Sequence, residues 1–569
     1  MTRKGTNSMP DLTSEYLALR DQYIEARFTK LNPMQRQAVF TTEGPLLILA
    51  GAGSGKTTVL VNRIANIIRF GSAHGSKELA RPVTEQDLND LRTAVATGRD
   101  LPRETAYLAV RPARPWNVLA ITFTNKAAGE LKERLRAMLG ETLGGDVFAS
   151  TFHSACVRFL RRDAERIGFP KSFTIYDSDD QQRVIKQIYK DLMIDDKFLP
   201  VKSAVSQISS FKDKLLSAED IASEAPRDTK AALISKIYTT YAARLKKAGA
   251  MDFDDLIYHT VKLLQNDEEA RRYYQDKFKY VVVDEYQDTS IAQFNLVRLL
   301  AGGSNNVCVV GDDDQSIYKF RGATIENILN FEKVFSGAKT IRLEQNYRST
   351  KYILDAANAV ISHNSGRKPK TLWTAQEGGD PIERYSADNE RDEAAFIARK
   401  ILQGVQQGAS YGDFAILYRT NAQSRVIEST LVNYGIPHKV FGGVRFYQRK
   451  EIADIMAYLR AIANPDDDVA FSRIINVPRR GIGDKTIDEL AAAAEKSGQS
   501  MLVTALSGEG LPPKIEQKLK GIVDLMSELM AQSALMPLSD FAKYLVDKIE
   551  YQAYLISEDK KGDALMRMD

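Results

Sequence analysis

The chain has 569 residues, of which 44% are hydrophobic and 27% are charged, and its formal net charge is +4. This length is enough for about three or four domains, and no stretch is apolar for long enough to span a membrane. The two cysteines, Cys156 and Cys308, are not spaced with histidines as metal ligands, which argues against both a disulfide scaffold and a zinc site.

The first 40 residues predict two helices. Residues 1–30 form a polar leader with a helix from about Leu12; the leader lacks the apolar core of a signal peptide, so we expect a cytoplasmic protein. A second helix begins in residues 31–39, with Asn32 as its N-cap. Because Gln35 comes ten residues before the next strand, its amide could hydrogen-bond an adenine edge; an ordinary amphipathic helix is the alternative.

Residues 45–57 combine a short apolar strand, a glycine-rich turn and the start of a helix. Such a turn curls the backbone so that its N–H groups face a phosphate, which is typical of a phosphate-binding loop. We expect Lys56 to reach the β- and γ-phosphates of a nucleoside triphosphate and Thr57 to ligate Mg²⁺. The expected nucleotide-binding residues here are Ala50, Gly51, Ala52, Gly53, Ser54, Gly55, Lys56, Thr57 and Thr58.

An inserted surface element is predicted at residues 71–114. Thr84 and Asp87 form a capping box at the start of a short helix, which is followed by an exit rich in proline and arginine. Its charges are mixed, so two interpretations stay open, a solvated surface and a basic loop that touches DNA.

Two further apolar strands, residues 118–123 and 147–151, end in polar residues. Ligands bind beyond the carboxyl ends of the strands in an open α/β sheet, so these ends lie on the functional edge. Hydroxyl and amide groups there suit sugar-phosphate contacts, and an exposed phenylalanine suits base stacking, although Phe123 and Phe152 could equally belong to the core. The candidate DNA-binding residues at these ends are Phe123, Thr124, Asn125, Thr151 and His153.

Residues 155–250 have an almost wholly helical pattern, which predicts a helical subdomain inserted in the first sheet. Residues 251–256 then mark the return to that sheet. The strand at residues 280–283 ends in Asp284, a candidate Mg²⁺ ligand, and Glu285, a candidate base for the attacking water.

The strand at residues 307–311 repeats this design and ends in Asp312, Asp314 and Gln315. A glutamine at this place can contact a γ-phosphate, and its position can then depend on whether the γ-phosphate is bound. The residues that follow it in the chain would move with it. Those residues are Tyr318, Lys319, Phe320 and Arg321.

A strand at residues 340–343 is expected to open a second α/β unit. Just after it, Arg348 can stabilise charge on a transferring phosphoryl group, and Tyr347 can stack on a base. The remaining expected features are strands at residues 414–418 and 439–442, helices from about residue 448, and a turn at Gly481 and Gly483 that exposes N–H groups to a phosphate.

Together these motifs resemble the UvrD/PcrA/Rep group of superfamily 1A DNA helicases, over about residues 30–550. The strings that carry the resemblance are residues 51–57, 122–128, 284–288, 311–318 and 345–348. The resemblance implies an α/β fold of two RecA-like domains with parallel sheets, each bearing an inserted helical subdomain. It also implies ATP and Mg²⁺ as cofactors, 3′-to-5′ movement on single-stranded DNA in repair or replication, and binding to single-strand/double-strand junctions.

The resemblance also assigns roles to single residues. Gln35 would read adenine, Tyr347 would stack on it, Gln315 would couple the γ-phosphate to DNA, and Arg348 would be an arginine finger. The implied path of the DNA bases is lined by Phe123, Phe253, Tyr318 and Phe320, and the implied contact with duplex phosphates is the turn from Gly481 to Gly483.

The resemblance divides the chain into a first RecA-like domain (residues 1–150 and 251–338), a helical subdomain (151–250), part of a second RecA-like domain (339–447) and an incomplete helical subdomain (448–569). The chain departs from the family in having Phe320 where tryptophan is usual, and in ending before the family's last motifs, so we expect an incomplete second domain. Two alternatives follow, a nucleotide- and DNA-binding fragment without unwinding activity, and the motor part of a recombination helicase–nuclease.

Overall fold

The computed structural model describes residues 12–101, 107–224, 229–441 and 449–558. The chain divides into two compact units, Met1–Gly379 and Asp380–Asp569, which are described separately. None of the helices within the described ranges is long and apolar enough to cross a membrane.

Six parallel strands form the central sheet of the first unit, in the order β3-β2-β6-β7-β1-β8. Successive side chains of a strand point to opposite faces. In β1, Leu46 and Ile48 therefore pack into the core on one face, whereas Leu47 and Leu49 pack into the core on the other. The strands are β1 (Leu46–Ala50), β2 (Val118–Thr122), β3 (Phe148–Thr151), β6 (Tyr280–Val283), β7 (Val307–Gly311) and β8 (Lys339–Leu343).

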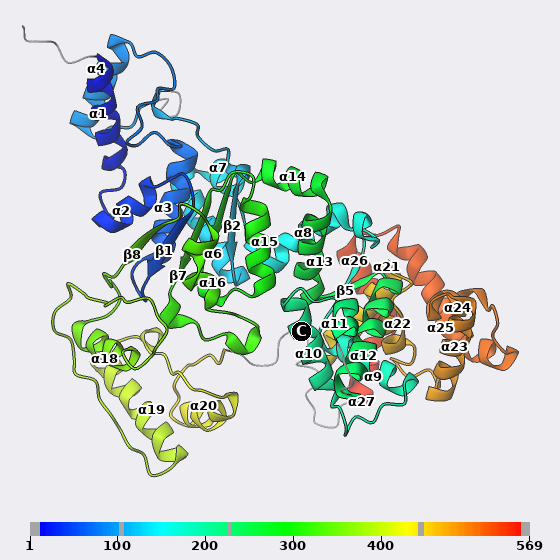
Figure 1. Cartoon of the computed structure of the whole chain (residues 1–569). Helices are drawn as coiled ribbons and strands as arrows, with labels where there is room; N and C mark the ends of the chain where they lie inside the picture. The colour runs from blue at the N-terminus through cyan, green and yellow to red at the C-terminus, as the bar shows by residue number, and fades with distance from the viewer. Residues whose placement is uncertain (1–11, 102–106, 225–228, 442–448, 559–569) are drawn as a thin grey trace, which may run out of the picture. The chain divides into compact units, whose positions relative to one another are not determined.

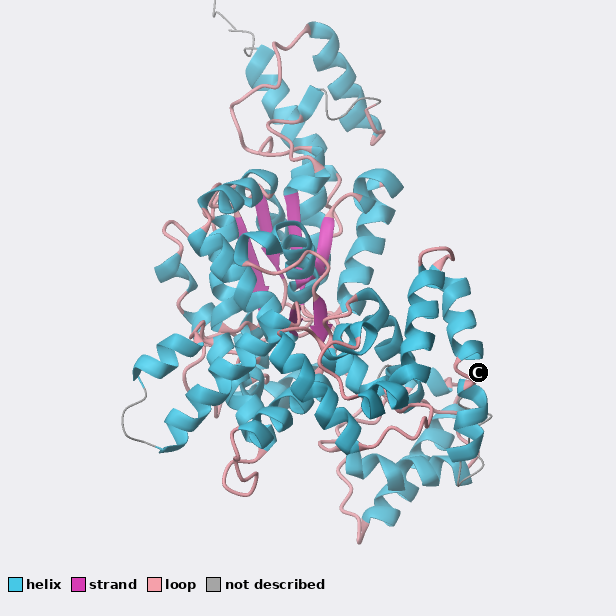
Figure 2. Ribbon diagram, turned by 90° about the vertical axis from the view of Figure 1, so that its right-hand side faces the viewer, coloured by secondary structure: helices cyan, strands magenta, loops and turns pink. Residues whose placement is uncertain are grey.

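Helices cover both faces of this sheet, so the strands are enclosed between two helical layers (Figure 2). One core contains α2 (Pro33–Phe40), α3 (Lys56–Arg69) and α6 (Asn125–Leu139) and continues into α1 (Leu12–Ala26) and α4 (Glu85–Thr97). The other contains α8 (Phe152–Asp163), α13 (Phe253–Asn266), α14 (Glu268–Lys277), α15 (Ile291–Ala301), α16 (Glu326–Leu329) and α17 (Phe331–Val334), and two further helices of this unit are α7 (Glu141–Gly145) and α18 (Lys351–Ile361). The α/β class and its parallel sheet are confirmed.

Strand β8 belongs to the first sheet, where it pairs with β1, and so does not open a separate α/β unit as expected. Its burial pattern fits a place at the edge of the sheet, because Ile341 and Leu343 are buried on one face whereas Arg342, between them, is exposed. Such alternation fits an edge strand that is covered on one face only.

The helical subdomain contains a small sheet that the sequence pattern did not predict. Strands β4 (Thr174–Tyr176) and β5 (Ala250–Asp252) pair in parallel, so residues 250–252 do not rejoin the central sheet. The chain nevertheless returns to the central core here, because Met251 of β5 and Leu256 of α13 (Phe253–Asn266) both pack into it. The helices of this subdomain are α9 (Ser178–Asp191), α10 (Val201–Asp213), α11 (Ala218–Glu224) and α12 (Thr229–Lys247), which Figure 1 labels near β5.

The regular elements in the described residues of the second unit are all helices, and irregular segments join them. The strands predicted at residues 414–418 and 439–442 are absent from the described residues, and residue 442 lies outside them. Leu417 is 94% exposed and Phe441 is 78% exposed, so neither segment has the neighbour that a buried parallel strand requires. The helices are α19 (Glu390–Gln406), α20 (Ser424–Asn433), α21 (Lys450–Ala463), α22 (Asp468–Ile474), α23 (Asp484–Ser497), α24 (Met501–Ser507), α25 (Pro513–Ser533), α26 (Leu538–Lys548) and α27 (Tyr551–Glu558).

Candidate functional site

The glycine-rich loop lies between the carboxyl end of β1 and the amino end of α3. Gly53 and Gly55 have φ angles of 66° and 83°, a region that favours glycine, and α3 begins at Lys56. The Ser54 hydroxyl donates to the Gly51 carbonyl at 2.7 Å and closes the loop on itself. The loop therefore presents the amino end of a 14-residue helix, which is an anion-binding arrangement.

Strand β6 delivers the two predicted carboxylates to the same edge of the sheet. Glu285 accepts a hydrogen bond from Lys56 Nζ at 3.2 Å, and its backbone has a φ of 49°, which is uncommon for a residue with a side chain. Asp284 is buried, and its Oδ1 accepts from the Glu285 N–H at 2.9 Å. Burial and then the charge of Glu285 raise the pKa of Asp284 to about 6.

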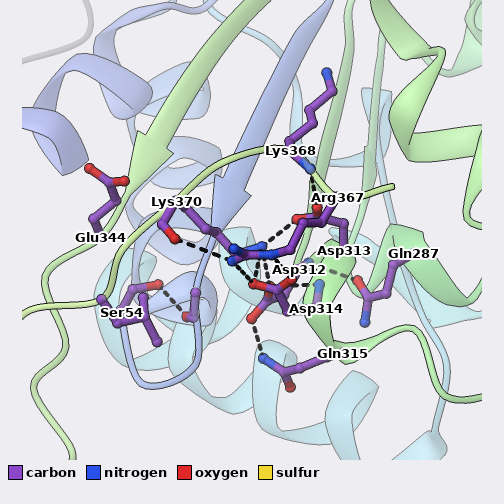
Figure 3. A network of polar contacts seen from close by, with 12 residues as sticks. Ser54, Gln287, Asp312, Asp313, Asp314, Gln315, Glu344, Arg367, Lys368 and Lys370 are labelled. Carbon is purple, nitrogen blue, oxygen red and sulfur yellow. Dashed lines mark hydrogen bonds and ion pairs between the residues drawn. The ribbon is translucent and has the colours of Figure 1, made fainter. Parts of the chain in front are cut away.

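A chain of hydrogen bonds joins Glu285 to Gln315, and Figure 3 shows its part from Gln287 to Gln315. Gln287 Nε2 donates to Glu285 Oε2 at 3.0 Å, and Gln287 Oε1 accepts from the Asp312 N–H at 3.0 Å. Gln315 Nε2 in turn donates to Asp312 Oδ2 at 2.6 Å. The structure thus brings together the predicted Glu285 and Gln315 through Gln287, which the sequence analysis missed.

Gln35 and Tyr347 lie at the same loop, although 312 positions separate them in the sequence. Gln35 Nε2 donates to the Ser54 carbonyl at 2.9 Å, and its Oε1 accepts from the Asn32 N–H at 3.0 Å. Asn32 Nδ2 donates to the Tyr347 hydroxyl at 2.8 Å, and the Tyr347 side chain is exposed. The two residues predicted to bind adenine are therefore neighbours through Asn32.

The segment after β8 also contacts the glycine-rich loop. Asn346 Nδ2 donates to the Ala52 carbonyl at 2.6 Å, and the Tyr347 N–H donates to the Gly53 carbonyl at 2.9 Å. The Arg348 N–H donates to Asn346 Oδ1 at 2.8 Å, and a Cβ at Gly53 would come within 2.8 Å of the Arg348 Cβ. Arg348 therefore lies beside the phosphate-binding loop, and Asn346, which holds it there, is a residue that the sequence did not point to.

One cavity of about 1360 Å³ connects the nucleotide side of the site with a group of aromatic side chains. Within this group, Tyr318 and Phe320 lie 6.0 Å apart, and the Arg321 guanidinium lies 5.1 Å and 5.5 Å from their ring centres. Phe320 is 75% exposed. The lining includes Thr57, Asp284, Glu285 and Gln315 and, from the aromatic side, Phe123, Thr124, His153, Tyr318, Phe320 and Arg321.

The other predicted DNA-binding residues of the first unit lie at helix starts. Phe253 begins α13, is 50% exposed and makes an edge contact with His153, whose pKa is lowered by burial. Thr124 and Thr151 cap α6 and α8 through their hydroxyls, and Asn125 is exposed at the start of α6.

Phe123 and Phe152 have different environments. Phe152 is 2% exposed and belongs to the core, whereas Phe123 is partly buried and packs against the Phe152 ring at 5.6 Å. Phe123 therefore keeps one side toward the cavity.

In the second unit, the predicted turn precedes α23. Gly481 and Gly483 are exposed, and the Ile482 N–H between them donates to Asn476 Oδ1 at 3.3 Å. Gly481 has a φ of 73°. The two glycines thus lie at the start of a 14-residue helix.

Sequence comparisons agree with this site. The model of the UvrD/REP helicase N-terminal domain matches residues 31–336, and that of the UvrD-like helicase C-terminal domain matches residues 341–506. The chain is 44% identical over 537 residues to the ATP-dependent DNA helicase PcrA of Staphylococcus epidermidis, which covers 94% of this chain and 68% of that protein. It is likewise 44% identical over 538 residues to PcrA of Staphylococcus aureus, with the same coverage.

Proposed function

The chain belongs to the UvrD/REP helicase family, and on this premise we propose that it is an ATP-dependent DNA helicase that moves 3′ to 5′ along single-stranded DNA. Single-strand/double-strand junctions are its proposed substrate. The observation that carries the proposal is the cavity of about 1360 Å³, which Glu285 and Gln315 share with Phe320.

For the nucleotide, we assign the adenine to Gln35 and Tyr347 and the phosphates to the loop and Lys56. In this structure the Lys56 ammonium pairs with Glu285. A γ-phosphate would compete for that ammonium and so free Glu285 to take a proton from the attacking water. Arg348, beside Gly53, would stabilise the charge that develops on the phosphoryl group.

The residues Thr57 and Asp284 fit a Mg²⁺ ion. Asp284 is a buried carboxylate beside a second carboxylate, a donor whose charge a hard divalent cation would balance. Thr57 lines the same cavity and offers a hydroxyl oxygen. When bound, Mg²⁺ would neutralise charge on the phosphate oxygens.

For DNA, the exposed rings of Phe253, Tyr318 and Phe320 provide faces on which bases stack without sequence preference. His153, whose pKa is lowered by burial, and the caps of α6 and α8 would contact the sugar-phosphate backbone of the DNA. Gln315 lines the same cavity, is linked to Glu285 through Asp312 and Gln287, and comes three positions before Tyr318, so we assign it the coupling of the nucleotide to DNA.

Direction of movement is tested with oligonucleotides that carry streptavidin at one end. A motor that moves 3′ to 5′ displaces streptavidin from the 5′ end in the presence of ATP, whereas Lys56→Ala, which weakens nucleotide binding, does not. Displacement from the 3′ end alone would contradict the proposed direction. Absence of displacement from both ends would contradict translocation.

A further inference from the structure

Lys370 lies in the irregular segment after α18, and its side chain is only 2% exposed. Its Nζ lies 2.8 Å from Asp312 Oδ1 and 2.8 Å from Asp314 Oδ2, and it also donates to Asp313 (Figure 3). Arg367, in the same segment, binds Asp314 through two hydrogen bonds of 2.6 Å. One buried ammonium thus occupies the centre of three consecutive carboxylates.

The ammonium of Lys370 balances the negative charge of the neighbouring aspartates. Asp312 and Asp313 are buried, and neighbouring buried carboxylates cannot all ionise without a counter-charge. Burial opposes the charge of Lys370, but its hydrogen bonds to the three aspartates raise its pKa, so it stays a cation. One carboxylate oxygen from each aspartate lies within 4.8 Å of the others, a spacing that would also suit a metal ion. Here the Lys370 ammonium supplies the positive charge between them.

Asp312 connects this cluster to the nucleotide site. One of its carboxylate oxygens faces Lys370, and the other accepts the amide of Gln315 at 2.6 Å. Its backbone N–H donates to Gln287, which binds Glu285. The orientation of Gln315 therefore depends on a carboxylate whose charge and position Lys370 fixes.

The segment that carries Lys370 also touches the phosphate-binding loop. Leu372 packs so closely on Gly51 that a Cβ at Gly51 would overlap it. The Asn346 N–H donates to the Trp373 carbonyl at 2.7 Å, which fixes the segment beside the residues that hold Arg348. Lys370 thus sits on a strap that contacts both the loop and the Gln315 end of the site.

We propose that Lys370 is a positioning residue for Gln315: by neutralising Asp312, Asp313 and Asp314 it holds Asp312 as the acceptor that orients the Gln315 amide toward the nucleotide. This role rests on the proposed function, in which Gln315 couples ATP hydrolysis to DNA. Lys370 would act through Asp312 and not through its own contact with nucleotide or DNA.

The test is a double-mutant cycle between Lys370→Met and Gln315→Ala, read as the ratio of ATPase rates with and without single-stranded DNA. We expect Lys370→Met to lower the DNA-stimulated kcat about tenfold, the scale of one lost hydrogen bond to a charged group, and to change KM for ATP less than twofold. The double variant should be no worse than Gln315→Ala alone, because both changes remove the same interaction. Lys370→Arg, which keeps the charge, should retain part of the stimulation.

Arg20→Met is the matched control for stability. Arg20 is also a buried cation, 1% exposed, and it donates to the Glu78 and Ser76 carbonyls far from the site. The Arg20→Met substitution should lower the melting temperature without changing the stimulation of the ATPase rate by DNA. If Lys370→Met does not fold, Lys370→Gln takes its place in the cycle, because its amide can still donate to the aspartates but carries no charge.

Two results would overturn the role of Lys370, namely full DNA stimulation in Lys370→Met, and losses that multiply in the double variant. If the unmutated chain itself shows no stimulation by DNA, the proposed function fails, and the role of Lys370 fails with it. The first two results leave the proposed function standing.

Discussion

Two buried lysines in the first unit are each surrounded by aspartates, but the aspartates around them position different side chains. Lys212 of α10 is 3% exposed and lies 2.6 Å from Asp252 and 2.7 Å from Asp255. Lys370 is 2% exposed and lies among Asp312, Asp313 and Asp314. Each lysine balances carboxylates that burial alone would force to take up protons.

The difference lies in what the aspartates do next. Asp252 caps α13, whose first residue is the exposed Phe253, so the Lys212 cluster fixes a helix start at the proposed DNA surface. Asp312 instead binds Gln315 and, through Gln287, Glu285. The same device thus positions a stacking ring in one place and a nucleotide-contacting amide in the other.

The largest effect should follow from Lys212→Met. Removing one partner of a buried ion pair leaves uncompensated charge, which typically costs about 3 to 5 kcal/mol of unfolding free energy. Denaturant unfolding followed by circular dichroism measures it, and Lys212→Arg is the matched variant that keeps the charge. An unfolding free energy equal to that of the unmutated chain would show that the Lys212 cluster does not contribute to stability.

Glu285→Gln should reduce ATP turnover by about a hundredfold or more, the scale of a lost general base, because the amide cannot accept the proton of water. Nucleotide affinity should remain nearly intact, whereas Lys56→Ala should weaken it. Titration with a fluorescent ATP analogue and steady-state phosphate release separate the two effects. Hydrolysis by Glu285→Gln at the parent rate would contradict the assignment of the base.

Phe320→Ala should weaken single-stranded DNA binding by about 1 to 3 kcal/mol, the range for one base–aromatic stack, with little change in melting temperature. Phe152→Ala is the matched control, because its ring is 2% exposed and its loss should lower stability instead. Fluorescence anisotropy with an oligothymidylate gives the affinity. A Phe320 variant with a lowered melting temperature but normal DNA affinity would show that this ring stabilises the fold and does not bind DNA.

The smallest effect concerns Asp213, a carboxyl without an ammonium partner among its described contacts. Burial and then the charge of Asp254 raise its pKa from 3.8 to about 7. The folded chain therefore binds this proton more tightly than the unfolded chain, so stability is lost as pH rises from about 4 to about 7. Asp213→Asn should remove that loss and raise the melting temperature at pH 8 by about 2 °C, with no gain at pH 4. Equal gains at both pH values would contradict the raised pKa.

Part of the site could be predicted because sequence neighbours of a strand stay neighbours in space. Lys56, Asp284, Glu285 and Gln315 each follow an apolar strand, and the carboxyl ends of parallel strands meet at one edge of the sheet. Because that rule holds for parallel sheets in general, these four residues could be predicted from the sequence of this chain.

Other parts could not be predicted because they depend on tertiary neighbours. Lys370 lies in an irregular segment, and its only signal was a short basic run that includes Arg367. Residues 414–418 have a strand-like pattern, yet an apolar run becomes a parallel strand only where another strand can pair with it. The same limit applied to β8, whose partner β1 was invisible in the sequence.

The central claim, that one cavity couples ATP hydrolysis to DNA, is tested most directly by titrating oligothymidylate into the chain with Mg-ATP and measuring phosphate release. The account predicts a rate that rises at least several-fold and saturates at the DNA affinity measured by anisotropy, with the rise lost in Gln315→Ala. A rate that is unchanged at saturating DNA would contradict it.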